Sequence, residues 1–185
     1  NLLGVHEIDQ HMSFLNRFLG LPPDSKTQDP KAVQAILSQL EALPLEDARL
    51  LASFAYVLAR VAYADLEVTQ AEREAMVRLV QDHMLLDPEQ AALVVRIATT
   101  QASRTGGTQD FVVTQLLSKL ASPELRAKIM DCLLAVAAAD DLIVGEEEKE
   151  MRLIAKQLGI SDKAFLKALR RYSDKRSVLK DWPTP

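Results

Sequence analysis

The sequence is poor in the residues on which several protein classes depend. One cysteine in 185 residues makes a disulfide framework impossible, and its place in the apolar run DCLLAV indicates that Cys132 is a buried thiol in a reducing compartment. The 6 glycines and 5% aromatic content argue against a sandwich or barrel rich in turns. No apolar run approaches the ~18 residues that a membrane span needs. We therefore expect a cytoplasmic, all-α protein.

The chain also lacks a signal-peptide pattern and an initiator methionine. It opens on Asn1, so we expect it to be a fragment of a longer protein. If that protein is membrane-anchored, this part would lie at the inner face of the membrane. The sequence leaves the oligomeric state open.

Charge is unevenly distributed along the chain. The net charge is −4, yet residues 163–180 contain seven basic residues and one acid. An acidic body with a basic end is a poor profile for a nucleic-acid binder, because phosphate backbones attract basic surfaces. The acidic body suits the binding of cations, so we expect no nucleic-acid partner.

Apolar residues recur at spacings of three and four along most of the chain, which predicts amphipathic helices. A chain of 185 residues is long enough for one domain with a sizeable core. We predict a single-domain helical bundle of about seven to nine helices. Its parts are an N-terminal helical extension (1–45), a main helical domain (46–172) and an irregular tail (173–185).

A twelve-residue stretch occurs twice. VAYADLEVTQAE, residues 61–72, returns as VAAADDLIVGEE, residues 136–147, with an offset of 75 residues. The same offset aligns further apolar and charged positions on either side. This similarity predicts two structural repeats, about 46–101 and 121–172, related by an internal pseudo-two-fold axis.

In each copy a helix that ends in Asp is followed by a helix that begins near a Glu. Asp65 extends the buried stripe of its helix and Glu72 begins the stripe of the next; Asp140 and Glu147 are the equivalents in the second copy. In an antiparallel hairpin the end of one helix meets the start of the next. Each turn should therefore bring an Asp and a Glu together at the edge of the core.

Two carboxylates that converge in a partly desolvated place repel one another, so each turn needs a compensating group. One candidate is the set of backbone N–H groups at the start of the second helix, and Thr69 with Glu72 forms the pattern of a capping box. The other is a hard divalent cation, which prefers oxygen ligands. Val144, the equivalent of Thr69, has no side-chain oxygen, so the second copy fits capping less well. Both interpretations stay open.

These motifs resemble the TerB-like family, named for tellurite-resistance proteins. The family pattern is Ala-Asp-Gly-x-φ-x-x-x-Glu, where φ is apolar, and Val68 and Ile143 occupy the apolar position here. The resemblance covers about residues 46–172. Leu66 and Asp141 replace the family glycine, and the leucine puts the first site in more doubt because glycine adopts a left-handed turn most easily.

The resemblance implies a helical scaffold or sensor associated with metal or tellurite stress, since some family members bind calcium at acidic clusters. Related domains occur beside J-domains in membrane-anchored co-chaperones. The metal-ligand positions that match the family pattern are Asp65, Glu72, Asp140 and Glu147. Asp141 and Glu67 add nearby oxygen donors.

Two functions follow as hypotheses. The first is a non-catalytic module that binds a divalent cation such as calcium. The second is a metal-free domain that contacts a protein partner through Lys167, Arg170 and Arg171, although basic residues in a last helix also favour its C-terminal dipole and face solvent.

We expect no enzyme. The chain has three histidines, none near the repeated motif, and it has no phosphate-binding glycine-rich loop. Acid–base chemistry by the carboxylate pairs is feasible, but nothing in the sequence indicates a substrate pocket.

Overall fold

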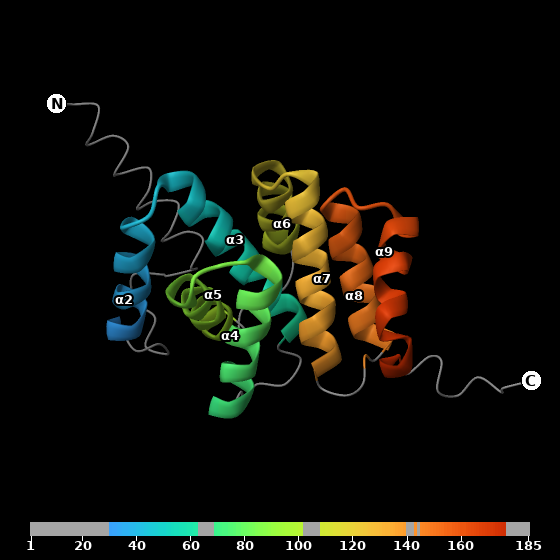
Figure 1. Ribbon diagram of the computed structural model, residues 1–185. Helices are drawn as coiled ribbons and strands as arrows, with labels where there is room; N and C mark the ends of the chain where they lie inside the picture. Colours follow the sequence, from blue (N-terminus) through green and yellow to red (C-terminus); the bar gives the residue numbers. More distant parts are fainter. Residues whose placement is uncertain (1–29, 63–68, 102–107, 140–142, 144, 177–185) are drawn as a thin grey trace, which may run out of the picture.

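The computed structural model describes residues 30–62, 69–101, 108–139, 143 and 145–176 (Figure 1). This part of the chain is helical, which confirms the predicted all-α class. The helices are α2 (Pro30–Glu41), α3 (Leu45–Ala62), α4 (Gln70–Met84), α5 (Pro88–Gln101), α6 (Thr108–Leu120), α7 (Pro123–Ala139), α8 (Gly145–Gln157) and α9 (Asp162–Leu169), followed by the 3-10 helix η2 (Arg170–Lys175).

Helix α3 is the central element of the bundle. It packs against α5, α6 and α7 and also contacts α2 and α8. The predicted stripe of Leu51, Phe54, Leu58 and Val61 is buried, but burial extends around the whole helix. The alanines recur every three or four residues and let neighbouring helices approach closely. A helix that is apolar on all sides belongs in the middle of a core.

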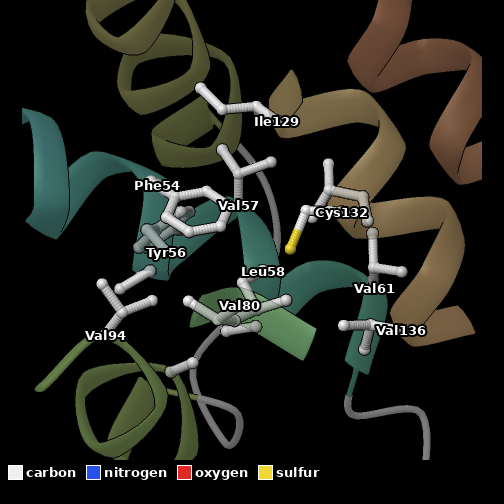
Figure 2. Packing of buried hydrophobic residues seen from close by; sticks show 14 of the residues in the cluster. Phe54, Tyr56, Val57, Leu58, Val61, Val80, Val94, Ile129, Cys132 and Val136 are labelled. Atoms are coloured by element: carbon white, nitrogen blue, oxygen red, sulfur yellow. The ribbon is translucent and has the colours of Figure 1, made fainter. Parts of the chain in front are cut away.

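Figure 2 shows the packing around α3. Phe54, Val57 and Leu58 meet side chains from α4, α5 and α7, among them Val80 and Cys132. Burial, with a smaller effect from the nearby Asp131 carboxylate, raises the pKa of the Cys132 thiol to about 12. Cys132 is therefore a neutral side chain of the core, as predicted.

One buried apolar cluster extends from Ile36 in α2 to Leu169 in α9. Helix α2, predicted as part of an N-terminal extension, therefore shares the core of the main domain. The predicted helix over residues 5–19 and the tail residue Trp182 lie outside the described residues. Within the described part, no helix is long and apolar enough to cross a membrane.

Ser122 and Ser161 precede helical patterns in the sequence, which predicts that each caps a helix, and the helix starts confirm this. The Ser122 hydroxyl accepts a hydrogen bond from the Leu125 N–H at 3.2 Å, and Ser161 accepts one from Ala164 at 3.3 Å. The starts of α4 and α8 lie 75 residues apart, as the repeat predicts. The pseudo-two-fold relation in space stays a prediction.

The last helix differs from its predicted range. It was expected to run to Tyr172, but α9 ends at Leu169 and the chain continues as a 3-10 helix with non-helical dihedrals at Tyr172. Residues 173–175 are thus helical where the sequence predicted an irregular tail. The chain then reaches Arg176, which forms an isolated parallel bridge with Ile143.

Two helices end on a residue in the left-handed conformation. After α8, Gly159 has φ of 73°, and the hydrogen bonds Gly159 N to Lys156 O (3.1 Å) and Ile160 N to Ala155 O (2.9 Å) form the predicted Schellman motif. After α4 the corresponding residue is Leu85, with φ of 56° and a side chain that is 75% exposed. A leucine is strained in this conformation and gains little burial here.

We predict that Leu85→Gly raises the free energy of unfolding by about 1 kcal/mol, because glycine adopts the left-handed conformation without steric cost. Urea denaturation measures the change. The matched control is Gly159→Ala, which should lower stability, since a Cβ at this position would lie 3.0 Å from Arg126 Nη1. A destabilised Leu85→Gly protein would contradict the strain argument.

Candidate functional site

Both repeated motifs lie where two helices meet. The ends of α3 and α7 and the starts of α4 and α8 lie toward the lower end of the bundle in Figure 1. Helix α7 packs against both α3 and α4, so the helices that carry the two motifs are neighbours; α3 and α4 themselves make little contact, unlike the packed hairpin that the sequence predicted. Four of the predicted ligands, Asp65, Glu67, Asp140 and Asp141, lie outside the described residues; Glu72 and Glu147 are described.

Glu72 belongs to a capping box, as the sequence predicted. Its Oε2 accepts hydrogen bonds from the Thr69 backbone N–H at 2.7 Å and from the Thr69 hydroxyl at 2.8 Å. The Thr69 hydroxyl in turn accepts a bond from the Glu72 N–H at 3.2 Å. The backbone N–H, followed by the hydroxyl, lowers the pKa of Glu72 below its ordinary value. The carboxylate thus has a structural role at the start of α4.

The three glutamates that open α8 have different surroundings. Glu146 is exposed and pairs with Lys149 at 2.7 Å, whereas Glu147 is half-buried. Glu148 is 13% exposed and accepts two hydrogen bonds of 2.9 Å from the Arg176 guanidinium. Arg152 approaches the same carboxylate to 3.6 Å. Arginines therefore compensate part of the charge in this acidic run.

The C-terminal segment also holds the turn between α7 and α8 through its backbone. Ile143 is buried, and its N–H donates a hydrogen bond of 2.6 Å to the Lys175 carbonyl. Together with the pair between Arg176 and Glu148, this bond attaches the C-terminal segment to Ile143 and to the start of α8. No local pattern in the sequence indicated this contact, because residues 173–185 were predicted to be irregular.

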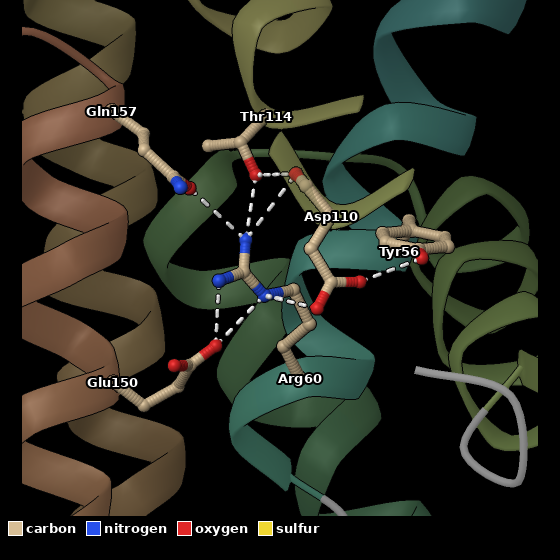
Figure 3. A network of polar contacts seen from close by, with 6 residues as sticks. All are labelled: Tyr56, Arg60, Asp110, Thr114, Glu150 and Gln157. Atoms are coloured by element: carbon tan, nitrogen blue, oxygen red, sulfur yellow. Dashed lines mark hydrogen bonds and ion pairs between the residues drawn. The ribbon is translucent and has the colours of Figure 1, made fainter. Parts of the chain in front are cut away.

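A buried arginine positions α8 against the centre of the bundle (Figure 3). The Arg60 side chain, on α3, is only 2% exposed. Its Nε and Nη2 donate to Glu150 Oε1 on α8 at 2.9 and 2.6 Å. Its Nη1 donates to Thr114 Oγ1 on α6 at 2.7 Å and to Gln157 Oε1 on α8 at 3.2 Å. One guanidinium therefore connects three helices.

Asp110 on α6 completes this network. Its Oδ2 lies 3.9 Å from Arg60 Nε, and its Oδ1 accepts a hydrogen bond of 2.8 Å from the Tyr56 hydroxyl. Burial raises the pKa of the Tyr56 phenol, and the hydrogen bond to Asp110 adds to the rise. The only sequence signal for the network was Arg60, a basic residue near the end of the apolar run of α3.

The three basic residues predicted to contact a partner lie at the C-terminal end of the described chain. Lys167 and Arg170 are exposed. Arg171 is exposed too, but its guanidinium pairs with Asp131 on α7 at 2.8 Å. The structure thus assigns Arg171 an intramolecular contact that the sequence did not indicate.

Within the described ranges, no group of three or more His, Cys, Asp or Glu side chains could hold a metal ion. Any site at the two turns would also need the aspartates that lie outside those ranges. Of the two described ligands, Glu147 lies half-buried in the first turn of α8.

The fold and these helix junctions define a small all-α bundle in which glutamates lie in the first turns of α4 and α8. Residues 50–170 match the family model described as Tellurite resistance protein TerB. The match covers more than half of the chain, so the protein belongs to the TerB family. Searches of curated proteins and of solved structures found no match.

We predict that Arg60→Ala lowers the free energy of unfolding by about 3–5 kcal/mol, because it leaves acceptors on α6 and α8 without their buried cation. Chemical denaturation measures the loss. The control, Glu150→Gln, removes a charge whose side chain is 35% exposed and should cost less. A loss near zero for Arg60→Ala would show that the network does not hold the helices together.

The capping box predicts a pH dependence. Because the folded pKa of Glu72 is lowered, its stabilising contribution is present above the ordinary value of 4.5 and is lost as pH falls through the folded pKa. The stability difference between the natural protein and Glu72→Gln should therefore be largest near neutral pH and should vanish in acid. Urea denaturation at a series of pH values tests this. Glu74→Gln, on the same helix but outside the capping box, is the control, and an equal pH dependence for both variants would contradict the prediction.

Proposed function

We propose that this TerB-family chain is a non-catalytic module that binds a divalent cation of the calcium type at the turn between α7 and α8. The ligands would be Asp140, Asp141 and Glu147. The module would act as a scaffold or sensor in a tellurite or metal stress response; the family description, Tellurite resistance protein TerB, supports the link to tellurite. The buried free thiol of Cys132 is in keeping with a cytoplasmic location.

The observation that supports the proposal is the anchoring of two described residues beside the acids of this turn. Ile143 donates its N–H to the Lys175 carbonyl and Glu148 pairs with Arg176, so the chain is held at both residues. A cation site gains affinity when its oxygen donors are held in place before binding, since less ordering then opposes binding. These two contacts therefore support a site built from the carboxylates that lie between and next to Ile143 and Glu148 in the sequence.

Charge supports the same turn. Residues 140–148 contain five acids, whereas the ion pairs described above bring three basic side chains to this run. One of those pairs, Lys149 with Glu146, is fully at the surface and contributes little. A divalent cation would offset part of the negative charge of this run.

The first turn is the weaker candidate. Glu72 Oε2 already accepts two hydrogen bonds from Thr69, so the capping box accounts for that carboxylate. A second ion at Asp65, Glu72 and Glu67 would have to share it. We therefore assign the tighter site to the second turn.

A non-catalytic role rests on the one thiol of the chain. Cys132 is buried in the core, and its pKa is raised to about 12, so the thiolate needed for nucleophilic catalysis is scarce near neutral pH. Asp110 and Glu150, the carboxylates of the Arg60 network, form hydrogen bonds between helices.

We predict that calcium raises the melting temperature of chelator-stripped protein. A ligand at 100 times its dissociation constant adds about 2.7 kcal/mol to the free energy of unfolding. The double variant Asp140→Asn with Glu147→Gln should lose this calcium-dependent shift, whatever its stability without calcium. Calorimetric scans with and without calcium measure both.

Glu146→Gln is the matched control for this experiment. It removes the same charge from the same helical turn, but its carboxylate points to an exposed lysine, so the calcium shift should remain. No shift with any divalent cation would reject the cation proposal. Exposed Lys167 and Arg170 would then favour the alternative, a metal-free domain that binds a protein partner.

A further inference from the structure

A groove of about 590 Å³ lies between α8 and α9, on a part of the surface that the proposed cation site does not use. Leu153, Ile160 and Phe165 form its apolar part. Leu153 is 45% exposed, one of the few large apolar side chains at the described surface, whereas Phe165 is fully buried beneath it. An apolar surface that stays open to water gains free energy when another apolar group covers it.

The rim of the groove is basic. Lys149, Arg152 and Lys156 line it at intervals of three and four residues along α8, so they lie along one face of the helix. The lysines are exposed, and Arg152 lies 5.3 Å from the centre of the Phe165 ring. Arg152 also pairs with Asp162, which is the only acid among the lining residues. The lining residues therefore carry a net charge of +2 on a chain whose net charge is −4, while two neighbouring acids of α8, Glu146 and Glu148, pair with Lys149 and Arg152.

We propose that this groove docks an acidic amphipathic segment of a partner protein. Aliphatic side chains of the segment would cover Leu153 and Ile160, and its carboxylates would pair with Lys149 and Lys156. An amphipathic helix that binds in a groove inserts apolar side chains that lie one turn apart. A groove of this volume holds only a few such side chains.

Charge complementarity selects this occupant. An acidic segment meets the basic rim on approach, whereas a basic segment would be repelled there. A nucleic acid would meet the rim too, but it has no aliphatic side chains for the apolar part.

The test uses the full chain in the presence of a chelator, so that failure of the cation proposal does not affect it. The probe is a fluorescein-labelled helical peptide with two leucines one turn apart and glutamates on the remaining faces. Fluorescence anisotropy measures its affinity. We expect saturable binding that weakens at least about tenfold for the double variant Lys149→Glu with Lys156→Glu, since each reversed charge faces a carboxylate.

The matched control is Lys163→Glu with Lys167→Glu, which makes the same charge change on exposed residues of α9 that do not line the groove. It should change the affinity by less than about threefold, because exposed charges at a distance are screened. Circular dichroism checks that both variants keep their helical content.

Three results would overturn the proposal. The first is no binding of the peptide, and the second is an equal loss of affinity in the groove and control variants, which would indicate non-specific attraction. The third is unchanged binding of a peptide whose leucines are replaced by serine, which would show that the apolar surface is not used. Self-association of the chain that Leu153→Ser abolishes would assign the groove to a second copy instead.

Discussion

The guanidinium of Arg60 is the contact on which the arrangement of the bundle depends. A buried cation is costly unless its donors are satisfied, and the acceptors of Arg60 come from α6 and α8 rather than from its own helix. Helices α6 and α8 must therefore lie at a defined distance from α3, and each must be rotated about its own axis so that its acceptors face Arg60. Apolar packing around α3 supplies most of the burial, and Arg60 adds the directional constraint that such packing lacks.

Helix α8 is consequently held from two sides. Glu150 faces the centre of the bundle and binds Arg60, and Glu148 binds Arg176 from the C-terminal segment. Glu147 directly precedes Glu148 in the sequence, in the first turn of the helix. Helix α8 is thus anchored through Glu148 and Glu150, and this anchoring supports the cation site proposed above.

Local patterns predicted the helices and their ends well, because stripes and caps depend on residues three or four apart. The capping box of Thr69 with Glu72 and the Schellman motif at Gly159 are examples. The acceptors of Arg60 lie 50 to 97 residues away, and Glu148 lies 28 residues from Arg176. Pairings over such separations leave no local pattern, so neither the Arg60 network nor the Glu148–Arg176 pair could be predicted from the sequence. The acids of the second turn were predicted as ligands, and of these Asp140 and Asp141 lie outside the described residues.

The most direct measurement is a crystal structure of the calcium-soaked protein at high resolution. We predict calcium density at the turn between α7 and α8, with carboxylate oxygens of Asp140 and Glu147 at about 2.4 Å from the ion. Arg176 should remain bound to Glu148 in that structure. Backbone N–H groups in contact with Glu147, with no ion density at this turn, would contradict the assignment and give the second motif the same capping role as the first.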